Sequence, residues 1–168
     1  MAYNPAYWHD FYVMTGGAAA ALTGLLFVAM SLHAREIMEN RFYSDRAIGT
    51  LMSLASQLIL SGAVLLPGQP IWLLGVEVEI AALFFLATTT RTVLARRTTK
   101  APLEMRFSHM LFESVGGAAW IVFFVAAGIS LIVGGGGGLY LLAVVMFFMF
   151  AWNIYIAWTL ITEASEAG

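Results

Sequence analysis

The sequence predicts an all-α integral membrane protein, a single membrane domain over residues 1–168 that folds as a bundle of five transmembrane helices. Composition, long apolar stretches and a one-sided distribution of basic residues support this fold class. The chain is 61% hydrophobic and 11% charged, whereas soluble domains carry about 25% charged residues. A chain of this length has too little interior to bury so much apolar surface, so the excess is expected to face lipid.

Five stretches are long enough to cross a membrane, because a helix needs about 20 apolar residues to span the hydrocarbon core. They are Tyr12–His33, Ala47–Pro67, Ile71–Leu94, Met110–Val133 and Leu139–Ile161. Two of the connections, Gly68–Pro70 and the glycine run Gly134–Gly138, are very short. The helices that they join are therefore expected to be antiparallel neighbours. The other two connections are longer and charged.

The basic residues predict the orientation of the chain. All eight Lys and Arg residues lie in or beside the two charged connections: Arg35, Arg41, Arg46, Arg91, Arg96, Arg97, Lys100 and Arg106. Because Lys and Arg resist translocation, these connections are expected in the cytoplasm. The N-terminus is then outside, and an odd number of spans places the C-terminus inside. Trp8, Trp72 and Tyr140 are expected to anchor the outer ends of spans at the membrane interface.

Two carboxylates interrupt the third stretch. Glu77 and Glu79 are expected roughly 9 and 12 Å from its outer end, at about 1.5 Å per residue. An ionisable residue within a span is costly and indicates a function. In a symmetric oligomer, one of the two would repeat as a ring of carboxylates, which selects cations in pores. Two alternatives stay open: both carboxylates lie at the headgroup level, or one of them is a neutral carboxyl.

Two uncharged polar residues lie deep within other stretches, Gln57 in the second and Asn153 in the fifth. Each side chain is able to hydrogen-bond to a neighbouring helix, which is the usual role of an amide in a membrane helix. Together with Glu77 and Glu79, they are the candidate residues of an ion pathway.

Small residues follow one face of the first stretch. Gly16, Ala20 and Gly24 are spaced four residues apart, a pattern that lets a second helix backbone approach closely. This pattern predicts an oligomer interface or a helix that lines a pore. Ordinary packing between helices of one chain explains it equally well.

Two His–Glu pairs are expected at the cytoplasmic edge. His33 and Glu36 are three residues apart, and His109 and Glu113 are four apart, so each pair shares a helical face where the helix is continuous. If the two helix ends adjoin, these side chains suit zinc, iron or manganese, or a proton relay. In the alternative interpretation they are interfacial and loop residues, and Glu113 pairs with a nearby arginine.

A catalytic serine is the remaining enzymatic interpretation. Ser130 and His9 are both predicted on the outer side, which would allow a Ser–His dyad of the intramembrane protease type. The glycine that usually follows the serine in such motifs is replaced by Leu131. The sequence therefore favours a protein without enzymatic activity, and no residue is assigned as catalytic.

One block resembles a known group of proteins. Trp8-His9-Asp10-Phe11, followed by the small-residue segment 17–29, is similar to the start of small actinobacterial membrane proteins. Some of these carry a label as modulators of a membrane-anchored AAA protease. The resemblance covers mainly the first stretch. It implies a bacterial inner-membrane location and transfers no catalytic residue.

The sequence thus predicts a homo-oligomeric ion channel or small transporter in the bacterial cytoplasmic membrane. The main alternative is a non-catalytic accessory or regulatory subunit of a larger membrane complex, and a metal-dependent or Ser–His enzyme is a third. A net charge of −2 offers no basic surface for nucleic acid. The lack of cysteine excludes disulfides and thiolate metal sites, and the cofactor, if any, is unknown.

Overall fold

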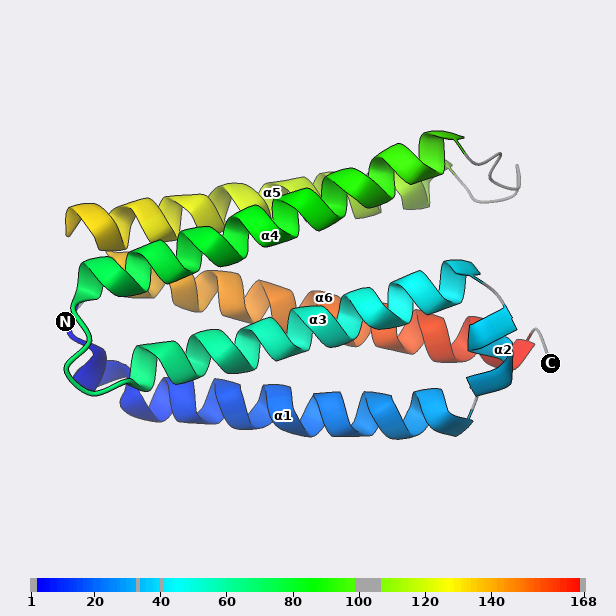
Figure 1. Cartoon of the computed structure of the whole chain (residues 1–168), viewed down its shortest axis with the longest axis horizontal. Coiled ribbons are helices and arrows are strands. Elements are labelled where there is room, and N and C mark those ends of the chain that lie inside the picture. Colours follow the sequence, from blue (N-terminus) through cyan, green and yellow to red (C-terminus); the bar gives the residue numbers. More distant parts are fainter. Residues whose placement is uncertain (1–2, 33, 40, 99–106, 167–168) are drawn as a thin grey trace. The chain divides into compact units, whose positions relative to one another are not determined.

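The computed structural model describes residues 3–32, 34–39, 41–98 and 107–166, and within this part of the chain every regular element is a helix. Figure 1 shows the elements. In chain order they are η1 (Pro5–Trp8), α1 (His9–Leu32), α2 (Ala34–Glu39), α3 (Arg41–Leu65), α4 (Ile71–Thr98), α5 (Phe107–Val133) and α6 (Gly138–Glu166). The all-helical fold class is confirmed. The last three predicted stretches lie within α4, α5 and α6; the first ends at His33, outside the described residues, and the second extends two residues past the end of α3 at Leu65.

Several helices are longer than the apolar stretches that predicted them. The helix α4 continues to Thr98, and α6 continues to Glu166. An apolar stretch marks only the part of a helix that is suited to hydrocarbon, whereas backbone hydrogen bonding continues into polar turns. Hydropathy therefore locates these helices well and underestimates how far α4 and α6 continue.

Four of the long helices are long and apolar enough to cross a membrane. These segments are Pro5–Leu32, Ser44–Leu65, Ile71–Thr88 and Gly138–Leu160. In α5 the apolar segment found among the described residues is shorter, Trp120–Val133. The outward surfaces of these helices carry large apolar side chains, for example Leu25, Ile59 and Val122 at 67%, 69% and 67% exposure. Such surfaces are compatible with an integral membrane protein, because lipid is the solvent that accepts them.

The chain divides into two compact units. Unit 1 comprises Tyr3–Gly68 and Met146–Gly168, and unit 2 comprises Gln69–Val145. Unit 1 therefore contains η1, α1, α2, α3 and most of α6. Unit 2 contains α4, α5 and the first turns of α6, so α6 contributes to both.

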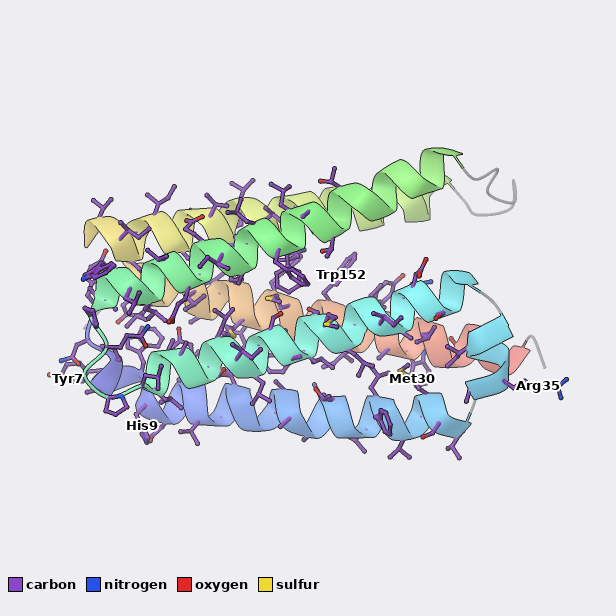
Figure 2. The ribbon with its side chains drawn as sticks, viewed as in Figure 1. Tyr7, His9, Met30, Arg35 and Trp152 are labelled. Atoms are coloured by element: carbon purple, nitrogen blue, oxygen red, sulfur yellow. The ribbon has the colours of Figure 1, made fainter. Side chains whose placement is uncertain are left out.

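Unit 1 is held by interlocking side chains. The helices α1 and α3 pack against each other (Figure 1), and α6 joins them through contacts such as the edge-on rings of Phe11 and Phe147, 5.4 Å apart. At the end near α2, a small apolar cluster of Ile37, Ala47 and Leu160 is packed against Met30. Figure 2 shows Tyr7 and His9 at one end of α1 and Arg35 beyond its other end.

Unit 2 is held by close backbone packing. A Cβ atom added to Gly75 of α4 would lie 2.8 Å from the backbone nitrogen of Ile132 and 2.9 Å from the carbonyl oxygen of Gly128. Only glycine permits this approach between α4 and α5. Further along the pair, Phe85 packs edge-on against Trp120, with ring centroids 5.0 Å apart, and also contacts Phe124.

The glycine run forms a tight turn between α5 and α6. Gly134 follows the last residue of α5 with a φ of 72°, a left-handed conformation that favours glycine after a helix. The N–H groups of Gly134 and Gly135 donate to the carbonyl of Ser130, and the Ser130 hydroxyl donates to the carbonyl of Gly135. The turn thus satisfies the Ser130 carbonyl in the last turn of α5 before α6 begins.

Candidate functional site

One face of α3 carries polar residues from Arg46 to Ser61. Arg46, Thr50, Ser53, Gln57 and Ser61 recur every three or four residues, which places them on one face of a helix with 3.6 residues per turn. We call these five residues the polar row. Thr50, Gln57 and Ser61 are buried, and Arg46 and Ser53 are half-buried. The row therefore faces the interior of unit 1.

Three members of the polar row bond to other helices of unit 1. The Ser61 hydroxyl lies 3.1 Å from that of Thr15 on α1. The amide of Asn153 on α6 donates to the Ser53 hydroxyl at 3.0 Å, and the Arg46 guanidinium donates to the Thr159 hydroxyl at 3.1 Å. Hydrogen bonds of this kind hold helices together where no hydrophobic force acts between them.

Gln57 differs from its neighbours in the row. Its side chain is 0% exposed, and neither its amide oxygen nor its amide nitrogen has a hydrogen-bond partner among the described residues. A buried polar group left without a partner costs about 1–3 kcal/mol. Ser53 and Ser61 lie about one turn away on either side. Gln57 is thus the point in the row with unused hydrogen-bonding capacity.

The two carboxylates of α4 have different surroundings in unit 2. Because α4 begins at Ile71, Glu77 lies in its second turn and Glu79 in its third. A carboxylate oxygen of Glu77 accepts a hydrogen bond of 2.8 Å from the side-chain amide of Gln69, which precedes the helix. The connection that precedes α4 therefore supplies the hydrogen-bond partner of Glu77.

Glu79 instead packs directly onto the backbone of α5. A Cβ atom added to Gly128 would lie 2.8 Å from Cδ and 2.9 Å from Cγ of Glu79, so this glycine provides the space for the carboxyl group. The Ile129 backbone amide faces the carboxyl group. One carboxyl oxygen is buried and has no hydrogen-bond partner in the part of the chain that is described.

The small residues of α1 divide between two environments. Gly16 is buried, and a Cβ atom at this position would lie 3.1 Å from Cβ of Ser61. Ala20 and Gly24 are exposed, and nothing lies within 4 Å of a Cβ added to Gly24. Gly16 thus serves packing between α1 and α3, whereas Ala20 and Gly24 leave an open face of small residues.

The four predicted metal ligands cannot be placed. His33 lies outside the described residues, as do the side chains of Glu36, His109 and Glu113. Among the residues that are described, no group of three or more His, Cys, Asp or Glu side chains is arranged to hold a metal ion. Ser130, considered above as a nucleophile, is 7% exposed and directs its hydroxyl to the Gly135 carbonyl.

A shallow groove lies on unit 1 beside the polar row. Its volume is about 130 Å³, and it is lined by leucines of α1 and α3 and by Asn153, Ile154 and Ala157 of α6. Asn153 is the one polar residue in this lining, and its amide donates to Ser53. Asn153 therefore connects the polar row, through its hydrogen bond to Ser53, to the lining of this groove.

The polar row was not recognised from the sequence, although Gln57 and Asn153 were. Ser53 lies four residues before Gln57 and Ser61 four residues after it, and this period is visible in the sequence. Counting polar residues at helical spacing within an apolar stretch would have found the row. Comparisons with protein-family models, with curated proteins and with solved structures find no match to this chain.

Proposed function

We propose that the protein is a homo-oligomeric cation channel or small cation transporter of a bacterial cytoplasmic membrane. In this proposal it has five spans, with the N-terminus outside. The four apolar helices support the membrane location, and the one-sided basic residues support the orientation. Trp72 and Tyr140, at the starts of α4 and α6, are 54% and 53% exposed, as suits aromatic residues at an interface.

The observation that carries the proposal is the environment of Glu79. A carboxylate in an apolar helix is costly to keep, and it persists where it has a function. Glu79 has a buried oxygen with no hydrogen-bond partner in the described chain, and carboxylate oxygens coordinate cations in selective pores. Glu77 has its partner in Gln69. We therefore assign the principal cation ligand to Glu79 and a secondary role to Glu77.

The open face of α1 supports the oligomeric part of the proposal. Ala20 and Gly24 are exposed, and so is Gly17, with nothing within 4 Å of a Cβ added to either glycine. Small residues on an exposed membrane helix let a second helix approach closely. A second copy of the chain would bring another Glu79 into the same assembly.

Cation flux into liposomes tests the proposal, with Glu77 as the matched control. Glu79→Gln is expected to lower the flux by about tenfold or more, equivalent to about 1.4 kcal/mol of lost interaction. Glu77→Gln is expected to have a smaller effect, because an amide at this position still bonds to Gln69. Equal flux in the wild type and both variants would overturn the proposal. A purified protein that is monomeric in mild detergent would remove its oligomeric part.

A second candidate function is that of an accessory subunit. It is favoured by one observation, the open face of small residues on α1, and it agrees with the expectation that the sequence resemblance of this segment raised. A larger membrane protein would then occupy this face in place of a second copy. This candidate predicts a stoichiometric partner on mild-detergent purification from the native membrane and no cation flux from the purified chain.

A further inference from the structure

The amide of Gln57 requires a ligand that both donates and accepts hydrogen bonds. Its oxygen is an acceptor and its nitrogen a donor, both are buried, and neither has a partner among the described residues. The other cross-helix pairs of the polar row are complete, between Ser61 and Thr15 and between Ser53 and Asn153. Thr50 bonds to the Arg46 carbonyl of its own helix, so Gln57 is the one member of the row whose side chain has no hydrogen-bond partner among the described residues.

The polar row offers no negative charge to a cation at this position. The row contains one ionisable side chain, Arg46, and it is positive. Its other members are hydroxyls and an amide, and the cross-helix partners at Thr15, Asn153 and Thr159 are also uncharged. A site of neutral donors and acceptors with an arginine at one end suits a small neutral molecule.

The spacing of Ser53, Gln57 and Ser61 along α3 suits a bridging water molecule. Residues four apart on a helix are separated by about 6 Å along its axis. A water molecule with two hydrogen bonds of about 2.8 Å bridges nearly this distance. Ser53 and Ser61 are four residues before and after Gln57, and buried waters typically make about three hydrogen bonds to polar groups of this kind.

We propose that Gln57 is the centre of a hydration site within unit 1, where water bridges its amide to the hydroxyls of Ser53 and Ser61. This water joins two separate bonded pairs into one polar path, from Asn153 on α6 through Ser53, Gln57 and Ser61 to Thr15 on α1. The path is uncharged. The proposal concerns unit 1 alone and does not depend on the carboxylates of unit 2.

Glutamine-selective labelling tests the proposal directly. The chain contains two glutamines, Gln57 and Gln69, so side-chain ¹⁵N labelling yields two amide signals, and Gln57→Met assigns them by removing one. Solid-state NMR of the wild-type protein in liposomes then measures magnetisation transfer from water to each amide. Gln69 lies half-buried in the connection before α4, where its amide donates to Glu77, and its signal is the internal reference. We expect transfer from water to the Gln57 amide. A Gln57 signal that receives no transfer from water would show a dry row and overturn the proposal.

A melting experiment gives an independent second measurement. Methionine has nearly the shape of glutamine and makes no comparable hydrogen bonds. If the Gln57 amide binds water, Gln57→Met loses those bonds, and Tm is expected to fall by about 2–4 °C. If the amide is dry, the substitution removes a buried group without a partner, and Tm rises instead. A rise would count against the hydration site.

Discussion

The two units bury their polar groups in different ways. In unit 1, uncharged hydroxyls and amides lie along α3 and bond across to α1 and α6. In unit 2, the polar groups of α4 are carboxylates, and one of them packs against the bare backbone of α5 at Gly128. Among the described residues, unit 1 has one side chain with buried polar atoms that lack a hydrogen-bond partner, Gln57, and unit 2 has two, Gln69 and Glu79. A polar residue in an apolar helix therefore indicates a function only when neighbouring residues leave its side chain without a hydrogen-bond partner.

The units also differ in how closely the helix backbones within each unit approach each other. The α4–α5 pair depends on Gly75 and Gly128, where the two backbones meet. In unit 1, packing depends on larger side chains such as Leu26 and Leu54, which are 4% and 2% exposed. Unit 2 should therefore be sensitive to the addition of a single methyl group, and unit 1 to the loss of hydrogen bonds.

The largest expected effect is at Gly75. Gly75→Ala places a methyl group against the backbone of α5, which cannot give way as a side chain can. We expect a loss of about 1–3 kcal/mol in the free energy of unfolding, measured by denaturant titration in detergent micelles. Gly62→Ala is the matched control, because Gly62 is in α3 with nothing within 4 Å of an added Cβ. A similar loss in both variants would contradict the proposed close packing.

The next effect concerns the bond between α3 and α6. Asn153→Ala and Ser53→Ala each remove one partner of a hydrogen bond within unit 1. A double-mutant cycle on unfolding is expected to give a coupling of about 0.5–1.7 kcal/mol, the range for such bonds between membrane helices. Strictly additive losses would mean that the two side chains do not bond in the folded protein.

A rescue experiment tests whether Gly128 provides the space for the Glu79 side chain. Gly128→Ala brings a methyl group against the side chain of Glu79, which is flexible, so the loss is expected to be smaller than at Gly75, about 1 kcal/mol. Truncation by Glu79→Ala removes the obstruction, and the double variant should recover most of that loss. If Gly128→Ala is equally destabilising with and without the Glu79 side chain, another contact limits this position.

The smallest effects are expected where a hydroxyl bonds to the backbone of its own helix. Ser56 donates to the carbonyl of Met52 in unit 1, and Thr90 donates to that of Leu86 in unit 2. Neither bond joins two helices. Ser56→Ala and Thr90→Ala should each change the free energy of unfolding by less than about 0.5 kcal/mol. A larger change at Ser56 would show that polar groups outside the polar row also matter in unit 1.

The sequence predicted the helices because hydropathy is a local property of the chain. It also showed that Gln57 and Asn153 are polar residues in apolar surroundings. It could not show that Asn153 bonds to Ser53 and leaves Gln57 unsatisfied, because this choice depends on how helices far apart in the sequence pack. Glu77 and Glu79 illustrate the same limit. They look alike in the sequence, and they are distinguished only by Gln69 and Gly128, which belong to other elements.

The polar row has a consequence for biosynthesis. Its partner on α1, Thr15, precedes α3 in the chain and is already present when Ser61 is made. Asn153 and Thr159 follow their partners by 100 and 113 residues, which corresponds to about 5–20 s of translation at typical rates. During this interval Ser53 and Arg46 lack their α6 partners, so nascent α3 exposes a half-satisfied polar face to its surroundings. The helix α6 therefore completes unit 1, and truncation of the chain before Asn153 would leave Ser53 and Arg46 of α3 without these α6 partners.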